Sequence, residues 1–200
     1  MPIPERKQSK ERRQHLLRCS LQLFIDKGYF NTTIRDIIAA SGVGTGTFYN
    51  YFVDKEDVLK ALLEEFAEQI IAGISQYYME EEDLYERFVE TKRITMEIFA
   101  RNQELSELYS RVAGASEPID QCLKAFEDKL IGFYSRNIEY GIQQGRFRNV
   151  PVTPVAHSIL ATEKFLLYKW VVLKDISREE MVAMVVSFHQ TLAWGLLADQ

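Results

Sequence analysis

The chain has 200 residues, a formal net charge of −5 and 46% hydrophobic residues. Its longest unbroken apolar run, residues 181–186, is far too short to span a membrane. The first residues show no apolar signal segment. Cys19 and Cys122 are its only cysteines, which predicts no disulfide framework and suits a reducing compartment. We therefore expect a cytoplasmic globular protein that does not enter a membrane.

Charge is unevenly distributed along the chain. Residues 1–55 hold nine Lys or Arg against five Asp or Glu, whereas residues 56–200 hold fifteen against twenty-four. A basic segment joined to an acidic one indicates that the basic part meets a polyanion. We predict two domains, residues 1–55 and residues 56–200.

Apolar residues recur at helical spacing nearly everywhere, and no segment alternates convincingly as a strand would. Gly28 is the expected end of the first helix. Thr33 and Asp36 have the spacing of a capping box at the start of a short second helix, which stops at residues 41–42. We predict an all-α chain of nine helices, the later ones over about 45–52, 54–79, 84–102, 104–114, 119–144, 154–174 and 177–198.

Residues 33–52 have the pattern of a helix-turn-helix. Phe48 and Phe52 are four residues apart and share one face of the second helix, so both are expected to pack into the core. At about 100° per residue, Gly46, Thr47 and Asn50 then point outward. This small, polar face suits close approach to a DNA groove, where Thr47 and Asn50 can bond base edges.

Two groups flank this face. The hydroxyls of Tyr49 and Tyr51 can hold phosphates and set the register on DNA. A basic arm is expected just before the first helix, where it can reach the DNA backbone or the minor groove: Arg6, Lys7, Lys10, Arg12 and Arg13. The alternative interpretation of the whole segment is a plain helical hairpin with exposed tyrosines and a solvated run of charge.

Residues 11–59 strongly resemble the DNA-binding domain of the TetR family of bacterial transcriptional regulators. The match runs through residues 24–33 and 37–43, then the stretch GTFYNYF at 46–52 and KEDVL at 55–59. The resemblance implies a nine-helix TetR-like fold. Its three N-terminal helices would form the helix-turn-helix domain, and a C-terminal helical domain would bind ligand and dimerise.

The resemblance also implies roles for single residues. Thr33 would cap the second helix and touch phosphate. The major groove would be faced by Thr45, Gly46, Thr47 and Asn50, and the DNA backbone would be held by Tyr49, Tyr51 and Lys55. Gly44 stands where the family often has a capping Ser, and it offers no hydroxyl. Thr45 stands where some relatives carry Lys, which leaves the operator sequence open.

The second domain carries polar residues on otherwise apolar helix stripes. A buried charge needs a partner, so such a residue either faces a ligand or belongs to a structural pair, as Lys92 and Glu163 would across two helices. Aromatic residues beside them either line a cavity or fill the core. The candidate ligand-contacting residues are Lys92, Phe99, Phe126, Phe133, Asn137 and Glu163.

The last two predicted helices are apolar over much of their circumference. Two such helices from each subunit would form a four-helix interface in a homodimer; the alternative is that the monomer covers these faces itself. No spacing of His, Cys or carboxylates predicts a metal site, and no nucleophile and base pair predicts catalysis.

These features favour a DNA-binding transcriptional regulator that is not an enzyme and needs no cofactor. The expected form is a homodimeric repressor on double-stranded DNA, released from a palindromic operator by a small apolar or amphipathic effector. The alternative is an architectural or partner-binding protein on the same fold, with a filled second domain and no effector. The sequence leaves open the effector, the operator and the choice between repression and activation.

Overall fold

The computed structural model describes residues 5–80 and 83–196 and is all-helical. Over these residues the prediction of nine α-helices is confirmed. Two of them continue into π-helical turns, Phe24–Gly28 after the first helix and Lys169–Leu173 after the eighth. The α-helices are α1 (Glu5–Leu23), α2 (Ile34–Ser41), α3 (Thr45–Tyr49), α4 (Lys55–Glu80), α5 (Leu84–Arg101), α6 (Gln103–Val112), α7 (Glu117–Gln143), α8 (Val152–Tyr168) and α9 (Arg178–Leu196).

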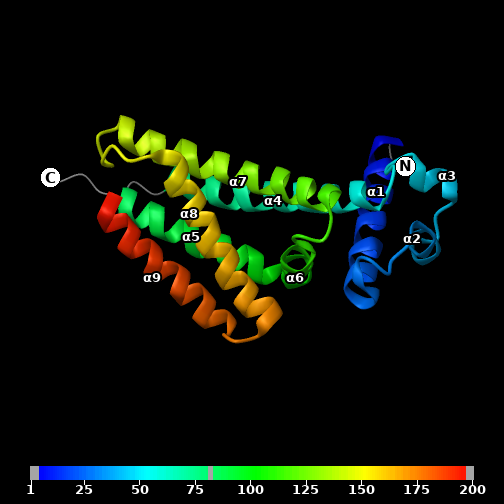
Figure 1. Cartoon of the computed structure of the whole chain (residues 1–200). Coiled ribbons are helices and arrows are strands. Elements are labelled where there is room, and N and C mark those ends of the chain that lie inside the picture. Colours follow the sequence, from blue (N-terminus) through cyan, green and yellow to red (C-terminus); the bar gives the residue numbers. More distant parts are fainter. Residues whose placement is uncertain (1–4, 81–82, 197–200) are drawn as a thin grey trace.

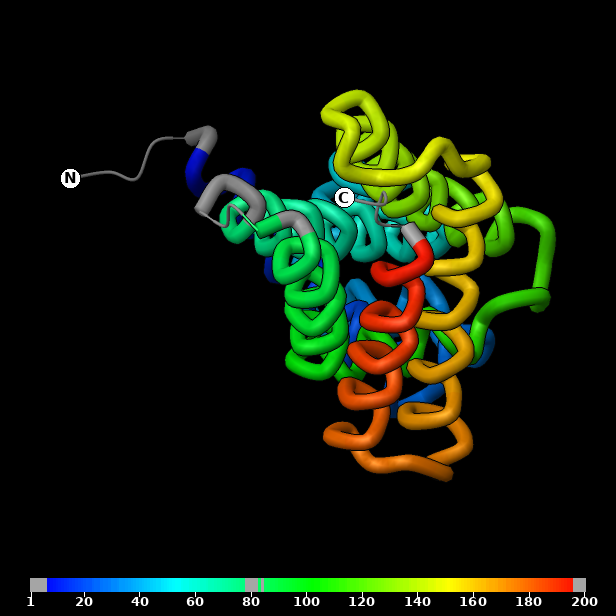
Figure 2. The backbone as a smooth tube through the Cα atoms, turned by 90° about the vertical axis from the view of Figure 1, so that its left-hand side faces the viewer, coloured from blue at the N-terminus to red at the C-terminus, as the bar shows by residue number. Residues whose placement is uncertain are grey.

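The helices form two groups joined by α4 (Figure 1). At one end, α1 packs on α2, and α3 lies beyond them. The long helix α4 leaves this group and packs along α5 and α7, while α5 also packs on α9, and α7 on α8. In the view along the molecule, α8 and α9 lie side by side on one flank of the second group (Figure 2). In the described part of the chain, no helix is both long and apolar enough to cross a membrane.

Local sequence signals explain where the N-terminal helices begin and end. The capping box at α2 is confirmed: Thr33 Oγ1 accepts a hydrogen bond from the backbone nitrogen of Asp36, whose carboxylate accepts one from the Thr33 nitrogen. Gly42 ends α2 at a φ of 67°, a left-handed conformation that glycine adopts without strain. The backbone nitrogen of Asp57 donates to the carboxylate of Asp54, which caps α4.

The predicted position of the basic arm is wrong. Helix α1 already begins at Glu5, so Lys7, Lys10 and Arg12 lie on an ordered helix, not on an extended arm before it. Arg13 faces inward: it forms an ion pair with Glu65 of α4, and its guanidinium lies 5.5 Å from the centre of the Phe52 ring. The side chain of Arg6 lies outside the described residues.

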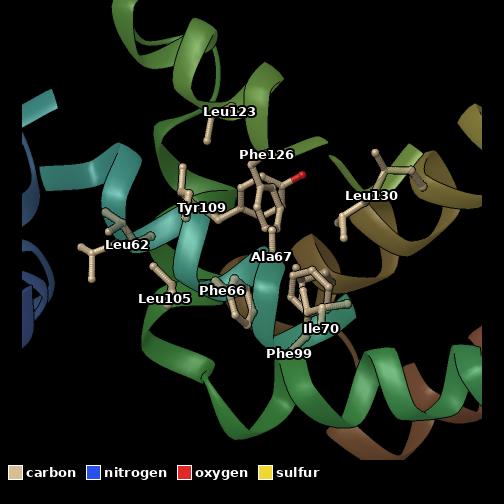
Figure 3. Close-up of a cluster of buried hydrophobic side chains, with 14 of the residues drawn as sticks. Leu62, Phe66, Ala67, Ile70, Phe99, Leu105, Tyr109, Leu123, Phe126 and Leu130 are labelled. Atoms are coloured by element: carbon tan, nitrogen blue, oxygen red, sulfur yellow. The ribbon is translucent and has the colours of Figure 1, made fainter. Parts of the chain in front are cut away.

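Aromatic rings fill the centre of the second group (Figure 3). Phe66 of α4 stacks on Phe126 of α7 with ring centres 5.8 Å apart, and meets Phe99 of α5 edge-on at 5.0 Å. Tyr109 of α6 completes the cluster at 5.0 Å from Phe126. This packing ties four helices to one core, because each ring buries a large apolar surface.

Candidate functional site

Helix α3 presents the small polar face that the spacing predicts. Phe48 is fully buried, which directs the other side of the short helix outward. Thr45, Gly46 and Asn50 are exposed and Thr47 is half-buried. Gly44 caps the helix in an extended conformation without a side-chain hydrogen bond, as its lack of a hydroxyl requires. The face is uncharged and free of bulky aliphatic groups, so a nucleic-acid groove can approach its backbone closely.

Two tyrosines flank this face in different ways. Tyr49 is 53% exposed, with its ring edge-on to Phe48. The hydroxyl of Tyr51 lies 3.1 Å from Ser9 Oγ on α1. The Ser9 contact was not predicted from the sequence, because it joins residues that are 42 positions apart. The contact holds the residues that follow α3 against helix α1.

The N-terminus of α2 is held by a small charge network. The Asp36 carboxylate accepts hydrogen bonds from the Thr33 hydroxyl at 2.7 Å and from Lys27 Nζ at 2.6 Å. Lys27, and then the bonds from Thr33, hold the pKa of the Asp36 carboxyl well below its usual range. Thr33 itself is exposed beside this helix start, where backbone N–H groups favour an anion such as phosphate.

Lys55 points inward in this structure. Its Nζ donates to the backbone carbonyls of Tyr29 at 2.8 Å and Thr32 at 3.1 Å, and burial lowers its pKa. These hydrogen bonds therefore hold the first turn of α4 against the segment that leads into α2. The resemblance to the TetR family implies that Lys55 contacts the DNA backbone. Two of its three ammonium hydrogens are used by the carbonyls, so such a contact would use the third.

The second group contains a buried ion pair that joins two of the predicted residues. Lys92 of α5 and Glu163 of α8 are 4% and 2% exposed, and Lys92 Nζ lies 3.6 Å from Glu163 Oε1. Tyr134 of α7 donates its hydroxyl hydrogen to Glu163 Oε2 at 2.8 Å, and its ring lies 3.3 Å from Lys92 Nζ. Burial lowers the pKa of Lys92 to about 8 and raises that of Glu163, while their mutual attraction opposes both shifts.

A small cavity adjoins this pair between α5, α7 and α8. Its volume of about 10 Å³ is close to the minimum that one water molecule needs. The lining residues include three of the predicted set, Lys92, Phe133 and Asn137, together with Phe88, Thr91, Tyr134, Ile138 and Ile159. The other three predicted residues are not lining residues: Glu163 lies behind the lining as the ion-pair partner of Lys92, and Phe99 and Phe126 belong to the packed aromatic cluster.

A second buried polar group near the pair was not predicted. His189 of α9 is fully buried, its Nδ1 lies 2.7 Å from the carbonyl of Val185, and its Nε2 has no hydrogen-bond partner. Burial, and then the charge of Lys92, lower the pKa of His189 to about 3. Among the described residues, no cluster of His, Cys, Asp and Glu is arranged to hold a metal ion.

Helices α8 and α9 keep part of their apolar surface uncovered. Some apolar residues of the two helices that the sequence predicts for the dimer interface, among them Ile159, Leu167 and Val185, are buried within the chain itself. Other large apolar side chains of these helices stay exposed: Phe165 at 60%, Tyr168 at 38%, Met184 at 46% and Trp194 at 69%. The monomer therefore covers one side of the two helices and leaves the other to solvent.

Comparison with known proteins decides the family. Residues 16–62, which contain the helix-turn-helix, match the family described as bacterial regulatory proteins of the tetR family. The crystal structure of a TetR-family transcriptional regulator from Syntrophomonas wolfei is 73% identical, with a TM-score of 0.92 over 96% of this chain and 99% of that one. The chain belongs to the TetR family. It is a transcriptional regulator with a DNA-binding helix-turn-helix, and not an enzyme.

More distant TetR-family members share less with this regulator. The repressor DhaR from Mycobacterium sp. (strain GP1) is 40% identical over 63 residues, which cover 32% of each chain. The matches to the first curated relatives thus span about a third of their length. The structure of FadR from Bacillus subtilis in complex with stearoyl-CoA is 18% identical, has a TM-score of 0.78 and covers 88% of this chain and 96% of that one. It supports the shared fold.

Proposed function

We propose that this TetR-family regulator is a homodimeric repressor that is released from a palindromic operator by a small apolar or amphipathic effector. One observation carries the DNA-binding part: the uncharged outer face of α3 is exposed at the end of the molecule, beyond α1 and α2. In this proposal Thr47 and Asn50, with Thr45 and Gly46, meet base edges in the major groove. The phosphate contacts come from Thr33, Tyr49, Tyr51 and Lys55.

We place the domain boundary between residues 55 and 56, where α4 starts. The segment before it supplies the DNA contacts, and the segment after it supplies the effector site and the dimer contacts. Because α4 packs on both groups, it is the element through which a change in one group reaches the other. A protein of this kind acts in the cytoplasm, where bacterial DNA is accessible.

The exposed apolar side of α8 and α9 supports the homodimer. Phe165, Tyr168, Met184 and Trp194 are too large and too exposed for a face that remains in water. A two-fold axis through this face would form a four-helix interface and pair the two α3 helices on one operator. Recognition helices in such dimers bind half-sites about 34–36 Å apart.

Two observations support the effector part. Lys92, Phe133 and Asn137 line one cavity, and Lys92 forms a buried ion pair with Glu163. FadR, a distant relative with the same fold, is known in complex with stearoyl-CoA. The effector would act by its higher affinity for a state in which the α3 helices no longer match the operator spacing.

The small volume of the cavity favours the second candidate function, an architectural or partner-binding protein with no effector. In this candidate the second group is a filled core and the ion pair is structural. Thermal stabilisation of the protein by a small molecule distinguishes the two, because a filled core offers no site.

Selection of bound duplexes from a random DNA pool tests the proposal. A palindromic motif of two half-sites is the expected result. Weak, strongly salt-dependent binding without a motif would contradict sequence-specific repression and support the architectural candidate.

A further inference from the structure

The cavity beside Lys92 is lined by both polar and apolar residues. Lys92 and Asn137 carry N–H donors, whereas Phe88, Phe133 and Ile159 are apolar. Lys92 Nζ lies 3.6 Å from its ion-pair partner Glu163 Oε1, which is longer than a normal hydrogen bond. Lys92 and Asn137 therefore bring N–H donors that a ligand oxygen can satisfy.

The charge of Lys92 is already balanced. Glu163 lies across from it, and the Tyr134 hydroxyl bonds the far oxygen of that carboxylate at 2.8 Å. Both charged side chains are almost completely buried. A ligand carboxylate would place two negative charges beside one positive charge in a site with little water, which is unfavourable. An uncharged acceptor would bond Lys92 without disturbing the balance.

We infer that the effector presents an uncharged carbonyl oxygen to Lys92 and Asn137, and that it is an amide, ester or ketone with an apolar body. The inference rests on the proposed function, since it names the chemical class of the effector. A carbonyl oxygen has two lone pairs, so it can accept one hydrogen bond from each side chain. The apolar body extends along Phe88, Phe133 and Ile159.

Entry of such a ligand widens the cavity. In this structure the cavity holds about 10 Å³, so the ligand binds a state in which α7 and α8 or the half-buried side chain of Phe133 have moved. This requirement links binding to a conformational change on the elements that pack on α4 and α9.

Matched ligands of equal chain length test the inference. Primary amides from butanamide to dodecanamide are compared with the carboxylates of the same lengths at neutral pH, on the full chain, by thermal unfolding and calorimetry. We expect an amide to bind at least about tenfold more tightly than the matched carboxylate. Equal or tighter binding of the carboxylate would overturn the inference.

Variants of the ion pair sharpen the test. Glu163→Gln removes the negative charge at nearly constant shape, so a carboxylate becomes the counter-ion of Lys92 and the preference should reverse. Asn137→Leu removes a donor without touching the pair and should weaken amide binding. Glu139→Gln, exposed on the same helix α7, is the control and should change neither.

The outcomes separate this inference from the proposed function. If Glu163→Gln still prefers the amide, the charge argument is wrong. If Glu163→Gln does not fold, the Asn137→Leu variant decides: unchanged amide binding in that variant overturns the inference by itself. Tighter carboxylate binding with a palindromic DNA motif overturns the inference alone. Loss of DNA selectivity with intact amide preference overturns the repressor proposal alone. If no ligand in either series binds, the inference and the effector part of the proposal both fall.

Discussion

The ammonium group of Lys55 donates a hydrogen bond to the backbone carbonyl of Tyr29 at 2.8 Å and lies 4.4 Å from the centre of the Tyr29 ring. Lys55 is the first residue of α4, and Tyr29 lies in the turn between α1 and α2. The contact therefore holds the start of the connecting helix against the DNA-binding group. Any rotation of α4 at its first turn must carry this segment with it or break the contact.

Replacing Lys55 with Met should destabilise the protein by about 1 kcal/mol, because two carbonyl acceptors lose a charged donor at a partly exposed site. DNA affinity should fall as well. Denaturant unfolding and titration with the selected duplex measure the two effects, with Lys60→Met, exposed on the same helix, as the control. If Lys55 contacts a phosphate, its replacement should also reduce the dependence of DNA affinity on salt concentration, the salt slope, by about one unit. An unchanged slope would leave Lys55 only the positioning role.

Thr47→Ala and Asn50→Ala should each weaken binding to the selected operator by about 1–3 kcal/mol and relax the base preference at one position of each half-site. Both side chains lie on the outer face of a helix that Phe48 anchors, so the fold should stay intact. Repeated selection from the random pool measures the preference. An unchanged motif in both variants would contradict their base-reading role.

Charge placed on the exposed side of α8 and α9 should dissociate the dimer. Phe165→Glu or Trp194→Glu puts a carboxylate into the proposed interface, and we expect the dimer dissociation constant to rise at least about tenfold. Sedimentation over a concentration series measures it. Tyr140→Glu alters a comparably exposed ring on α7 and serves as the control. A wild-type chain that sediments as a monomer would refute the homodimer itself.

Acidification should destabilise the protein through His189. Its pKa in the folded state is lowered to about 3, while an unfolded chain binds the proton near pH 6.5. Between these values the unfolded state binds more protons, so stability falls as pH falls from about 6.5 towards 3, by roughly 2 kcal/mol at pH 5. His189→Leu should remove this part of the pH dependence of unfolding, whereas His157→Leu, exposed on α8, should keep it.

Phe126→Ala should cost about 3–5 kcal/mol of folding free energy, because it opens a cavity where Phe126 stacks on Phe66. Phe30→Ala, at a ring that is 59% exposed, is the control and should have little effect. Chemical denaturation of both variants provides the comparison. A small loss in Phe126→Ala would mean that the centre of the second group is loosely packed and able to admit ligand there.

The sequence by itself determined the helices, the family and the outward face of α3. These depend on local signals: the capping box at Thr33 and Asp36, the left-handed glycine at Gly42, and the four-residue spacing of Phe48 and Phe52. Each signal acts within a few residues, so it can be recognised before the fold is known.

Only the tertiary structure decided which residues on the inward faces of the helices contact one another. Periodicity placed four residues on inward helix faces: Lys92, Phe99, Phe126 and Glu163. The contacts between helices then paired Lys92 with Glu163 and placed Phe99 and Phe126 in the aromatic core. Lys55 likewise bonds carbonyls more than twenty positions away. Such partners depend on how whole helices cross, and the number of residues between two positions in the sequence does not determine that geometry.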